Sequence, residues 1–381
     1  MDNILKLLLG QLVFIAFIGL VQAEEPKSFP KRVENTLKKE LEAVINKHNL
    51  PGANIGIWIP GKGEWAHSFG MANKSAKEPL KLECYFRIGS ITKTFVTTAI
   101  LQLVDKGLIS LDDKIGKHIN NVPNGDIITI RQLANMTSGL ANYSENDEWL
   151  DKIIFSESKR FIPAQELLDV AFAMPILFEP GKGWKYSNTN TVLLGQVIEK
   201  KSGLSLDKYL QKNIFEPLEL DHTLYPTDHN IPTPYAHGYT KQTIDGKEAD
   251  ASLNNPSWTN AAGQLISTIG DLKKWAKALG TGALLSKKVF EERTKWANLP
   301  PNTDKRHYGL GVGFNNGWIY HTGELPGYNS IAAYLPKEQA IIVIMVNTDM
   351  HSLINGKPEG PADIIFEAIR KILTSQNVPL I

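Results

Sequence analysis

Apolar residues recur with two different periods along the 381-residue chain, and the two periods mark different kinds of element. Alternating or continuous apolar runs near both chain ends predict strands at 53–59, 64–69, 308–314, 318–321, 330–335 and 340–346. Residues 60–63, Pro-Gly-Lys-Gly, form a turn signal that predicts a hairpin between the first two strands. Amphipathic patterns predict helices at 29–48 and 361–374, and helical patterns joined by loops dominate from about 91 to 290.

This order of elements predicts an α+β fold. Strands from both chain ends would form one antiparallel sheet flanked by helices, and a mostly helical subdomain would be inserted between them. We expect a single domain over 24–381, with the sheet part at about 24–90 and 300–381 and the helical part at about 91–299. A ligand site is expected in the cleft between the two parts.

The N-terminal segment has the pattern of a signal peptide. Residues 4–21 are almost continuously apolar and are followed by the small residue Ala23 and two glutamates. We therefore expect a signal peptide at 1–23 and an exported protein, periplasmic or secreted. The alternative is an uncleaved anchor, since the apolar run approaches spanning length. Cleavage is favoured by Ala23 and by the polar break at Gln11, and it would leave no membrane span in the mature chain.

Charge and cysteine content exclude several classes of function. The chain has 41 Lys and Arg against 40 Asp and Glu, without a basic run, so neither nucleic acid nor an anionic surface is expected as a partner. Its one cysteine, Cys84, cannot form an internal disulfide and is expected to be a small buried apolar residue. The chain contains neither H-E-x-x-H nor G-x-S-x-G, and we expect no metal or other cofactor.

The strongest candidate for chemistry is the pair Ser90 and Lys93, at the start of an apolar helix. Residues three apart on a helix are neighbours on one face. A lysine anchored there in a core would be held neutral and could accept the proton of the serine hydroxyl. The pattern S-x-x-K occurs four times, so it is weak evidence alone. The pairs at 28/31, 156/159 and 205/208 lie near the expected mature N-terminus, in a polar run and at a helix N-cap.

Two further motifs follow in the chain. Tyr186-Ser187-Asn188 precedes a predicted helix at 191–202, and His321-Thr322-Gly323 ends a predicted strand. Each has a structural explanation, a capping asparagine in one case and a strand-end turn in the other. Three motifs in this order, each on the type of element that its role requires, are hard to obtain by accident.

The motifs SITK, YSN and HTG resemble those of the serine β-lactamase and penicillin-binding-protein superfamily. The branch that they resemble contains class C β-lactamases and low-molecular-weight D-alanyl-D-alanine carboxypeptidases. The likeness covers roughly residues 30–375, including ITIRQLANMTSGLANY at 128–143 and YGLGVGF at 308–314. It implies a β-lactamase/transpeptidase-like fold.

The resemblance implies a role for each motif residue. Ser90 would attack a carbonyl to form an acyl-enzyme, and Lys93 would accept or relay its proton. Tyr186 would pass a proton to the leaving group and help to activate water. Asn188 would bind the substrate amide and orient Lys93. The backbone N–H groups of Ser90 and Glu324 would form the oxyanion hole.

The third motif would bind the far end of the substrate. His321 and Thr322 match positions that bind a substrate carboxylate, and Gly323 would let substrate approach the strand edge. Because an unperturbed histidine is cationic only below about pH 6.5, we expect carboxylate binding through His321 to weaken as pH rises. Class C β-lactamases typically carry a lysine at this position. No arginine lies between Tyr308 and His321, and Arg306 falls just outside.

These departures limit the function that the resemblance implies. It is that of a D-alanyl-D-alanine carboxypeptidase, or of a related peptidase, amidase or esterase on cell-wall-like or small acyl substrates. The expected partners are a small-molecule or peptidoglycan-peptide substrate, and β-lactams as covalent ligands. A class C-like β-lactamase is one alternative. A penicillin-binding sensor or binding module without turnover is the other.

Overall fold

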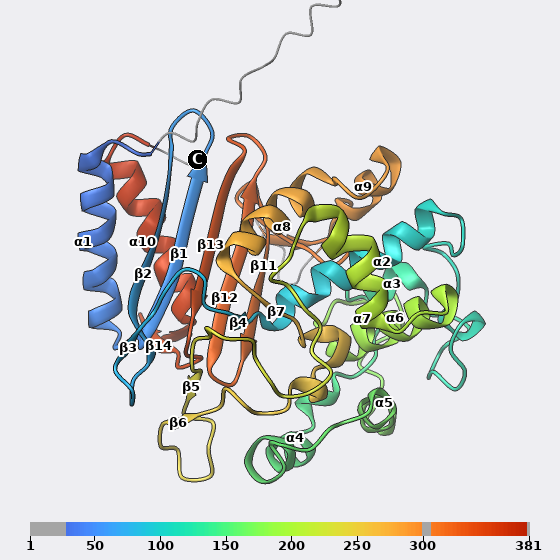
Figure 1. Cartoon of the computed structure of the whole chain (residues 1–381). Coiled ribbons are helices and arrows are strands. Elements are labelled where there is room, and N and C mark those ends of the chain that lie inside the picture. The colour runs from blue at the N-terminus through green and yellow to red at the C-terminus, as the bar shows by residue number, and fades with distance from the viewer. Residues whose placement is uncertain (1–27, 299–305, 379–381) are drawn as a thin grey trace, which may run out of the picture.

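The computed structural model describes residues 28–298 and 306–378, and a nine-stranded antiparallel sheet forms the centre of this part (Figure 1). The predicted signal peptide at 1–23 lies outside the described residues. In spatial order the strands are β3 (Glu78–Pro79), β2 (Gly63–Asn73), β1 (Gly52–Ile59), β13 (Ala340–Val346), β12 (Tyr328–Leu335), β11 (Trp318–Leu325), β10 (Gly313–Asn315), β9 (Arg306–Tyr308) and β8 (Ala297–Asn298). The two chain ends meet where β1 pairs with β13, with Ile55 opposite Ile344. The predicted α+β architecture is confirmed.

Helices and short strand pairs complete the structure. The helices are α1 (Lys31–Lys47), α2 (Thr92–Asp105), α3 (Ile130–Ala134), α4 (Asp147–Asp151), α5 (Ala164–Ala173), α6 (Asn188–Ser202), α7 (Leu206–Leu210), α8 (Ile269–Thr281), α9 (Lys287–Arg293) and α10 (Pro361–Ser375). The short pairs are β4 (Phe86–Arg87) with β7 (Ile266–Ser267), β5 (Tyr239–Thr240) with β6 (Ala249–Asp250), and β14 (Ser352–Ile354) with β15 (Lys357–Glu359).

One face of the sheet is covered by α1 and α10, which lie side by side in Figure 1. The buried residues of α1 recur every four positions, at Val33, Leu37, Leu41 and Ile45. This spacing gives the helix one apolar stripe, and the stripe packs in one core with isoleucines that include Ile55 of β1 and Ile344 of β13.

A second core lies on the opposite face, where α8 packs on β12 and β13 and also contacts α2 through side chains. The ring of Phe95 in α2 stacks on that of Trp275 in α8, with 3.7 Å between centroids. Nearly every residue of α2 is buried, so this helix is surrounded by protein. Although α8 falls in the range predicted as the helical part, it covers the sheet, and both parts share this core.

The prediction of one strand over 308–314 is wrong. The chain turns between β9 and β10, where the Gly309 N–H donates to the Val312 carbonyl at 2.8 Å and Gly311 has φ +71°. The short β10 that results pairs with β11 only as far as Tyr320. The edge of β11 beyond this point is therefore not covered by β10.

Within residues 28–298 and 306–378, no helix combines the length and the apolar character needed to cross a membrane.

Candidate active site

Ser90 lies in a 3-10 turn (Gly89–Ile91) that leads directly into α2. The preceding Gly89 has φ +49°, and a Cβ at this position would lie 2.6 Å from the backbone nitrogen of Glu324. Glycine is therefore required for the turn to approach the end of β11 so closely. Ser90 is only partly buried, so its hydroxyl can meet a substrate.

Lys93 is fully buried at the second position of α2, one turn after Ser90. Its Nζ lies 2.9 Å from Ser90 Oγ and donates to the carbonyl oxygen of Ala262 at 2.8 Å. Burial lowers the pKa of Lys93 well below its usual value, because the charged form loses its hydration. A neutral amine keeps a lone pair, and the distance allows that lone pair to take the Ser90 proton.

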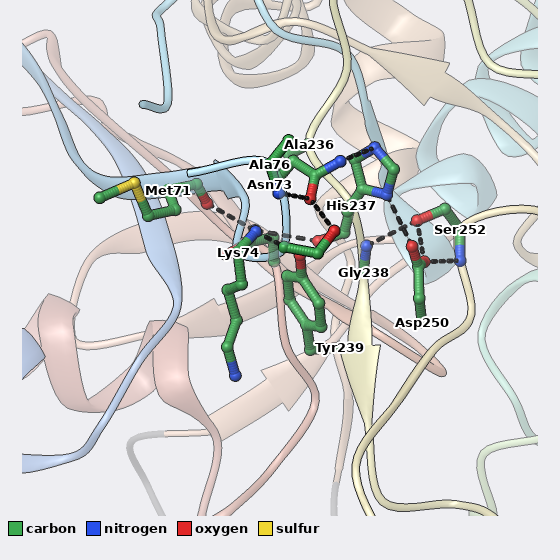
Figure 2. A network of polar contacts seen from close by, with 12 residues as sticks. Met71, Asn73, Lys74, Ala76, Ala236, His237, Gly238, Tyr239, Asp250 and Ser252 are labelled. Carbon is green, nitrogen blue, oxygen red and sulfur yellow. Dashed lines mark hydrogen bonds and ion pairs between the residues drawn. The ribbon is translucent and has the colours of Figure 1, made fainter. Parts of the chain in front are cut away.

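The carbonyl of Ala262 belongs to the long segment between α7 and α8, which is tied to the sheet by a polar network (Figure 2). His237 lies between β6 and β2. Its Nδ1 is 2.6 Å from Oδ2 of Asp250 in β6, and its Nε2 is 3.1 Å from Nδ2 of Asn73 in β2. Since the asparagine nitrogen only donates, Nε2 accepts and Nδ1–H donates. The Gly238 N–H donates to Ser252 Oγ at 2.9 Å. The bond to Asn73 ties this segment to β2, and the bonds to Asp250 and Ser252 hold two parts of the segment together.

Tyr186 lies beside both residues of the pair. Lys93 Nζ is 4.7 Å from the centroid of the Tyr186 ring. Burial raises the pKa of Tyr186 well above its usual value, and interaction with the Ser90 side chain only partly opposes this. The hydroxyl is therefore protonated at neutral pH and can donate. Ser90, Lys93 and Tyr186 come from two distant parts of the chain and meet at one point.

Asn188 begins α6, and its side chain has a partner other than the predicted one. Its Nδ2 donates to Ser144 Oγ at 2.9 Å, while its backbone N–H donates to Asn142 Oδ1 at 3.1 Å. The hydrogen bonds of Lys93 in the described structure go to Ser90 and Ala262, so Ala262 has the orienting role predicted for Asn188. A backbone carbonyl in a distant segment has no motif, so nothing in the sequence pointed to it.

His321 is buried, and its surroundings disfavour the predicted role as a cationic carboxylate ligand. Loss of hydration, together with the nearby Lys93, lowers the pKa of His321 to about 3. The histidine is therefore neutral throughout the physiological range. Its Nε2 lies 3.0 Å from Tyr308 Oη and its Nδ1 lies 2.6 Å from the carbonyl oxygen of Thr322.

The remaining predicted residues follow His321 along β11. Thr322 is partly exposed, whereas Gly323 is buried against the Ile88 carbonyl. The Glu324 carboxylate is exposed and engages Asn329 Nδ2 and His351 Nε2, each at 2.7 Å. The close approach of Gly89 to the Glu324 nitrogen brings together the two segments whose N–H groups were predicted to form an oxyanion hole.

Cys84 is free and buried, as its predicted structural role requires.

Comparison with known proteins identifies the family. The sequence profile described as "Beta-lactamase" matches residues 32–352. The chain belongs to the beta-lactamase family. The fold is the β-lactamase/transpeptidase-like fold, and the chain is a serine hydrolase of this family.

The curated relatives of the chain carry different names. The chain is 28% identical to Penicillin-binding protein 4* of Bacillus subtilis over 90% of its own length and 81% of the relative's. It is 26% identical to Protein flp of Staphylococcus aureus (strain MRSA252) over 83% of its own length, and it spans 64% of that protein's length.

Two solved structures carry amidase names. The D-stereospecific amidohydrolase from Streptomyces sp. is 31% identical with a TM-score of 0.78, over 88% of this chain and 98% of that one. The D-amino acid amidase from Ochrobactrum anthropi SV3 is 25% identical with a TM-score of 0.79, over 90% and 98%.

Proposed function

We propose that this hydrolase forms an acyl-enzyme on Ser90 and acts on amides, peptides and esters whose leaving end carries no carboxylate, with D-amino-acid amides as the leading substrate class. The observation that carries this choice is the neutral, buried His321. Burial also lowers the pKa of Lys93, so neither basic side chain among the predicted site residues favours a fixed positive charge. The likeness to a D-stereospecific amidohydrolase and a D-amino acid amidase supports the same class.

Arg306 is too far along the sheet to bind a substrate carboxylate. It pairs with Asn315, which in turn pairs with Trp318, so it lies level with the start of β11. Thr322 is four residues further on, roughly 13 Å at 3.3 Å per residue. Arg306 instead lines a cavity of about 640 Å³ between the sheet and α10. Arg306 is therefore not placed to bind a D-Ala-D-Ala carboxylate as the arginine of some carboxypeptidases does.

In the proposed acylation step, the proton of Ser90 passes through Lys93 and Tyr186 to the leaving group. Lys93 Nζ takes the Ser90 proton as Oγ bonds to the substrate carbonyl carbon, and the oxyanion is stabilised by the N–H groups of Ser90 and Glu324. Tyr186 donates a proton to the leaving amine or alcohol as its bond to carbon breaks, and the Lys93 proton replaces it. Water then attacks the ester with the same groups acting in reverse, which releases the acid and restores Ser90.

The test is a turnover panel at one pH. It compares a D-amino-acid amide, a D-Ala-D-Ala peptide, a short-chain p-nitrophenyl ester and a cephalosporin chromophore, with Ser90→Ala as the blank. We expect hydrolysis of the amide and the ester and modest activity on the D-Ala-D-Ala peptide. In a separate incubation with a fluorescent penicillin, we expect labelling and slow release of the penicilloyl adduct. Cephalosporin turnover far above amide and ester turnover would instead support a β-lactamase. Labelling without turnover of any substrate would support a sensor.

Export is a separate proposal. It rests on the apolar segment at 4–21 and the small residue Ala23. The mass of the protein recovered from an expressing cell would test it, and we expect a chain that begins at Glu24. A full-length chain retained in the membrane fraction would support the anchor.

A further inference from the structure

Tyr308, at the end of β9, has no part in the proposed chemistry, yet it contacts the third motif directly. Its Oη lies 3.0 Å from His321 Nε2, and both side chains are buried. Burial raises the pKa of Tyr308 well above its usual value, so the hydroxyl keeps its proton. The ring also packs against Tyr186, with 6.3 Å between centroids.

The hydrogen-bond partners determine the tautomer of His321. Its Nδ1 lies 2.6 Å from the Thr322 carbonyl oxygen, which can only accept, so Nδ1 carries the hydrogen. In the neutral ring Nε2 is then an acceptor, and the Tyr308 hydroxyl is the donor that satisfies it. One arrangement of hydrogens therefore satisfies both ring nitrogens and the tyrosine.

This arrangement fixes the backbone at a critical point of β11. The Thr322 carbonyl lies beyond Tyr320, where pairing with β10 has ended. The next residue, Gly323, touches the Ile88 carbonyl, two residues before Ser90. A shift of the Thr322–Gly323 peptide would move β11 relative to the nucleophile.

We propose that Tyr308 is a positioning residue for acyl transfer: its hydroxyl holds His321 as the neutral Nδ1–H tautomer, and that ring fixes the Thr322 peptide beside Ser90. The inference rests on the proposed acyl-enzyme at Ser90. Tyr308 itself touches neither the nucleophile nor the substrate in this mechanism.

The same contact keeps positive charge away from Lys93. If His321 were protonated, both ring nitrogens would donate, and the buried Tyr308 hydroxyl would lose its acceptor. The titratable groups around the ring are Lys93 of α2, Tyr186 and Tyr308, with Tyr320 and the buried Arg293 beyond Tyr308. A second cation at His321 would oppose any positive charge that Lys93 takes up during acylation.

Tyr308→Phe tests the proposal because it removes only the hydroxyl. We expect kcat on a p-nitrophenyl ester to fall about tenfold, with KM changed by less than about twofold. We expect no new ionisation in the pH profile between about pH 5 and 7, because burial of His321, which lowers its pKa, is unchanged in this variant. The matched control is Tyr320→Phe, a neighbouring tyrosine on β11 whose ring lines the cavity beside α10. It should behave as wild type.

A double-mutant cycle separates positioning from general destabilisation. In His321→Asn the amide can still donate to the Thr322 carbonyl, but Tyr308 has no imidazole to hold. Adding Tyr308→Phe to this variant should then cost no further activity, because the two residues act as one unit. Additive losses, or a Tyr308→Phe variant whose kcat equals that of wild type, would overturn the proposal.

The two proposals fail in different ways. Covalent labelling of Ser90 by a phosphonate probe in the wild-type protein tests the acyl-enzyme alone. If labelling and ester turnover are normal and Tyr308→Phe matches wild type, only the role of Tyr308 is refuted. If Ser90 is never labelled and no ester is turned over, the acyl-enzyme itself is refuted.

Discussion

A Cβ on Gly323 would lie 1.9 Å from the carbonyl oxygen of Ile88, so β11 and the segment that carries Ser90 touch backbone to backbone. On the other side of this contact, a Cβ on Gly89 would lie 2.6 Å from the Glu324 nitrogen. Two glycines, more than 230 residues apart in sequence, thus set the distance between the nucleophile and the strand edge.

Gly323→Ala should therefore separate these two segments. The methyl group would meet backbone, which cannot move aside as a side chain can, and β11 would shift by a substantial fraction of an ångström. Misplacement on this scale can cost about 100-fold in rate, and we expect a loss of kcat/KM of at least that size. Gly270→Ala is the control, since its Cβ would meet nothing closer than 4.0 Å. Equal kcat/KM for Gly323→Ala and wild type would contradict the contact.

Ser90→Ala should abolish covalent labelling by a fluorescent penicillin or phosphonate. Ser156→Ala and Ser205→Ala, which alter two of the other S-x-x-K sequences, should label as wild type does. Gel fluorescence with intact-protein mass spectrometry is the measurement. Because residues acting as a unit lose activity non-additively, Ser90→Ala/Lys93→Ala should be little worse than either single variant. Loss of labelling in Ser205→Ala would mean that the wrong pair had been chosen.

Lys93→Met should be inactive yet no less stable than wild type at pH 7. Burial in the folded chain lowers the pKa of Lys93, whereas the unfolded chain protonates it below a pKa of about 10.4. The unfolded state then binds the extra proton, so this residue's contribution to the free energy of unfolding falls as pH is lowered through that range. Each unit of pKa depression corresponds to about 1.4 kcal/mol.

Thermal unfolding at several pH values measures this effect. The difference in Tm between Lys93→Met and wild type should favour the variant more strongly at pH 7 than at pH 10. Lys106→Met, at the exposed end of α2, is the control and should show no such trend. A difference that stays constant with pH would show that Lys93 is not held neutral.

Because His321 is neutral, we expect the preference between a carboxylate substrate and its amide to be independent of pH. With its pKa lowered to about 3, His321 does not titrate between pH 5 and 8. The ratio of kcat/KM for a D-Ala-D-Ala peptide to that for its C-terminal amide should therefore be constant over this interval. A ratio that falls tenfold as pH rises from 5 to 8 would restore the cationic role expected from the sequence.

The same histidine lowers the free energy of unfolding in acid, because the unfolded chain binds its proton below about pH 6.5 and the folded chain does not.

Much of the fold followed from local patterns. The apolar run of β13 and the four-residue spacing of α1 are strong signals, because each element buries its apolar side chains in a regular geometry. The strand predicted over 308–314 failed because Gly309 and Gly311 allow a tight turn that alternation alone does not reveal.

The site was predicted less completely than the fold. The spacing of Ser90 and Lys93 places them on one helix face, a local property that the 2.9 Å distance bears out. The neutral state of His321 and the carbonyl of Ala262 depend on contacts with β9 and with a segment almost 170 residues from Lys93. Burial of this kind arises only in the assembled fold, so residue type and spacing could not reveal it.

The early end of β10 also affects how much strand edge is exposed to aggregation between copies of the chain. A strand edge with free N–H and C=O groups is a template for another chain and a hazard for aggregation. Beyond Tyr320 this edge faces the turn that carries Ser90, and the carbonyl of Thr322 is already bonded by His321. The stretch of β11 that an extended polypeptide could pair with is therefore short, and it lies beside Ser90. The length of β10 thus sets how much of the β11 edge remains for a ligand.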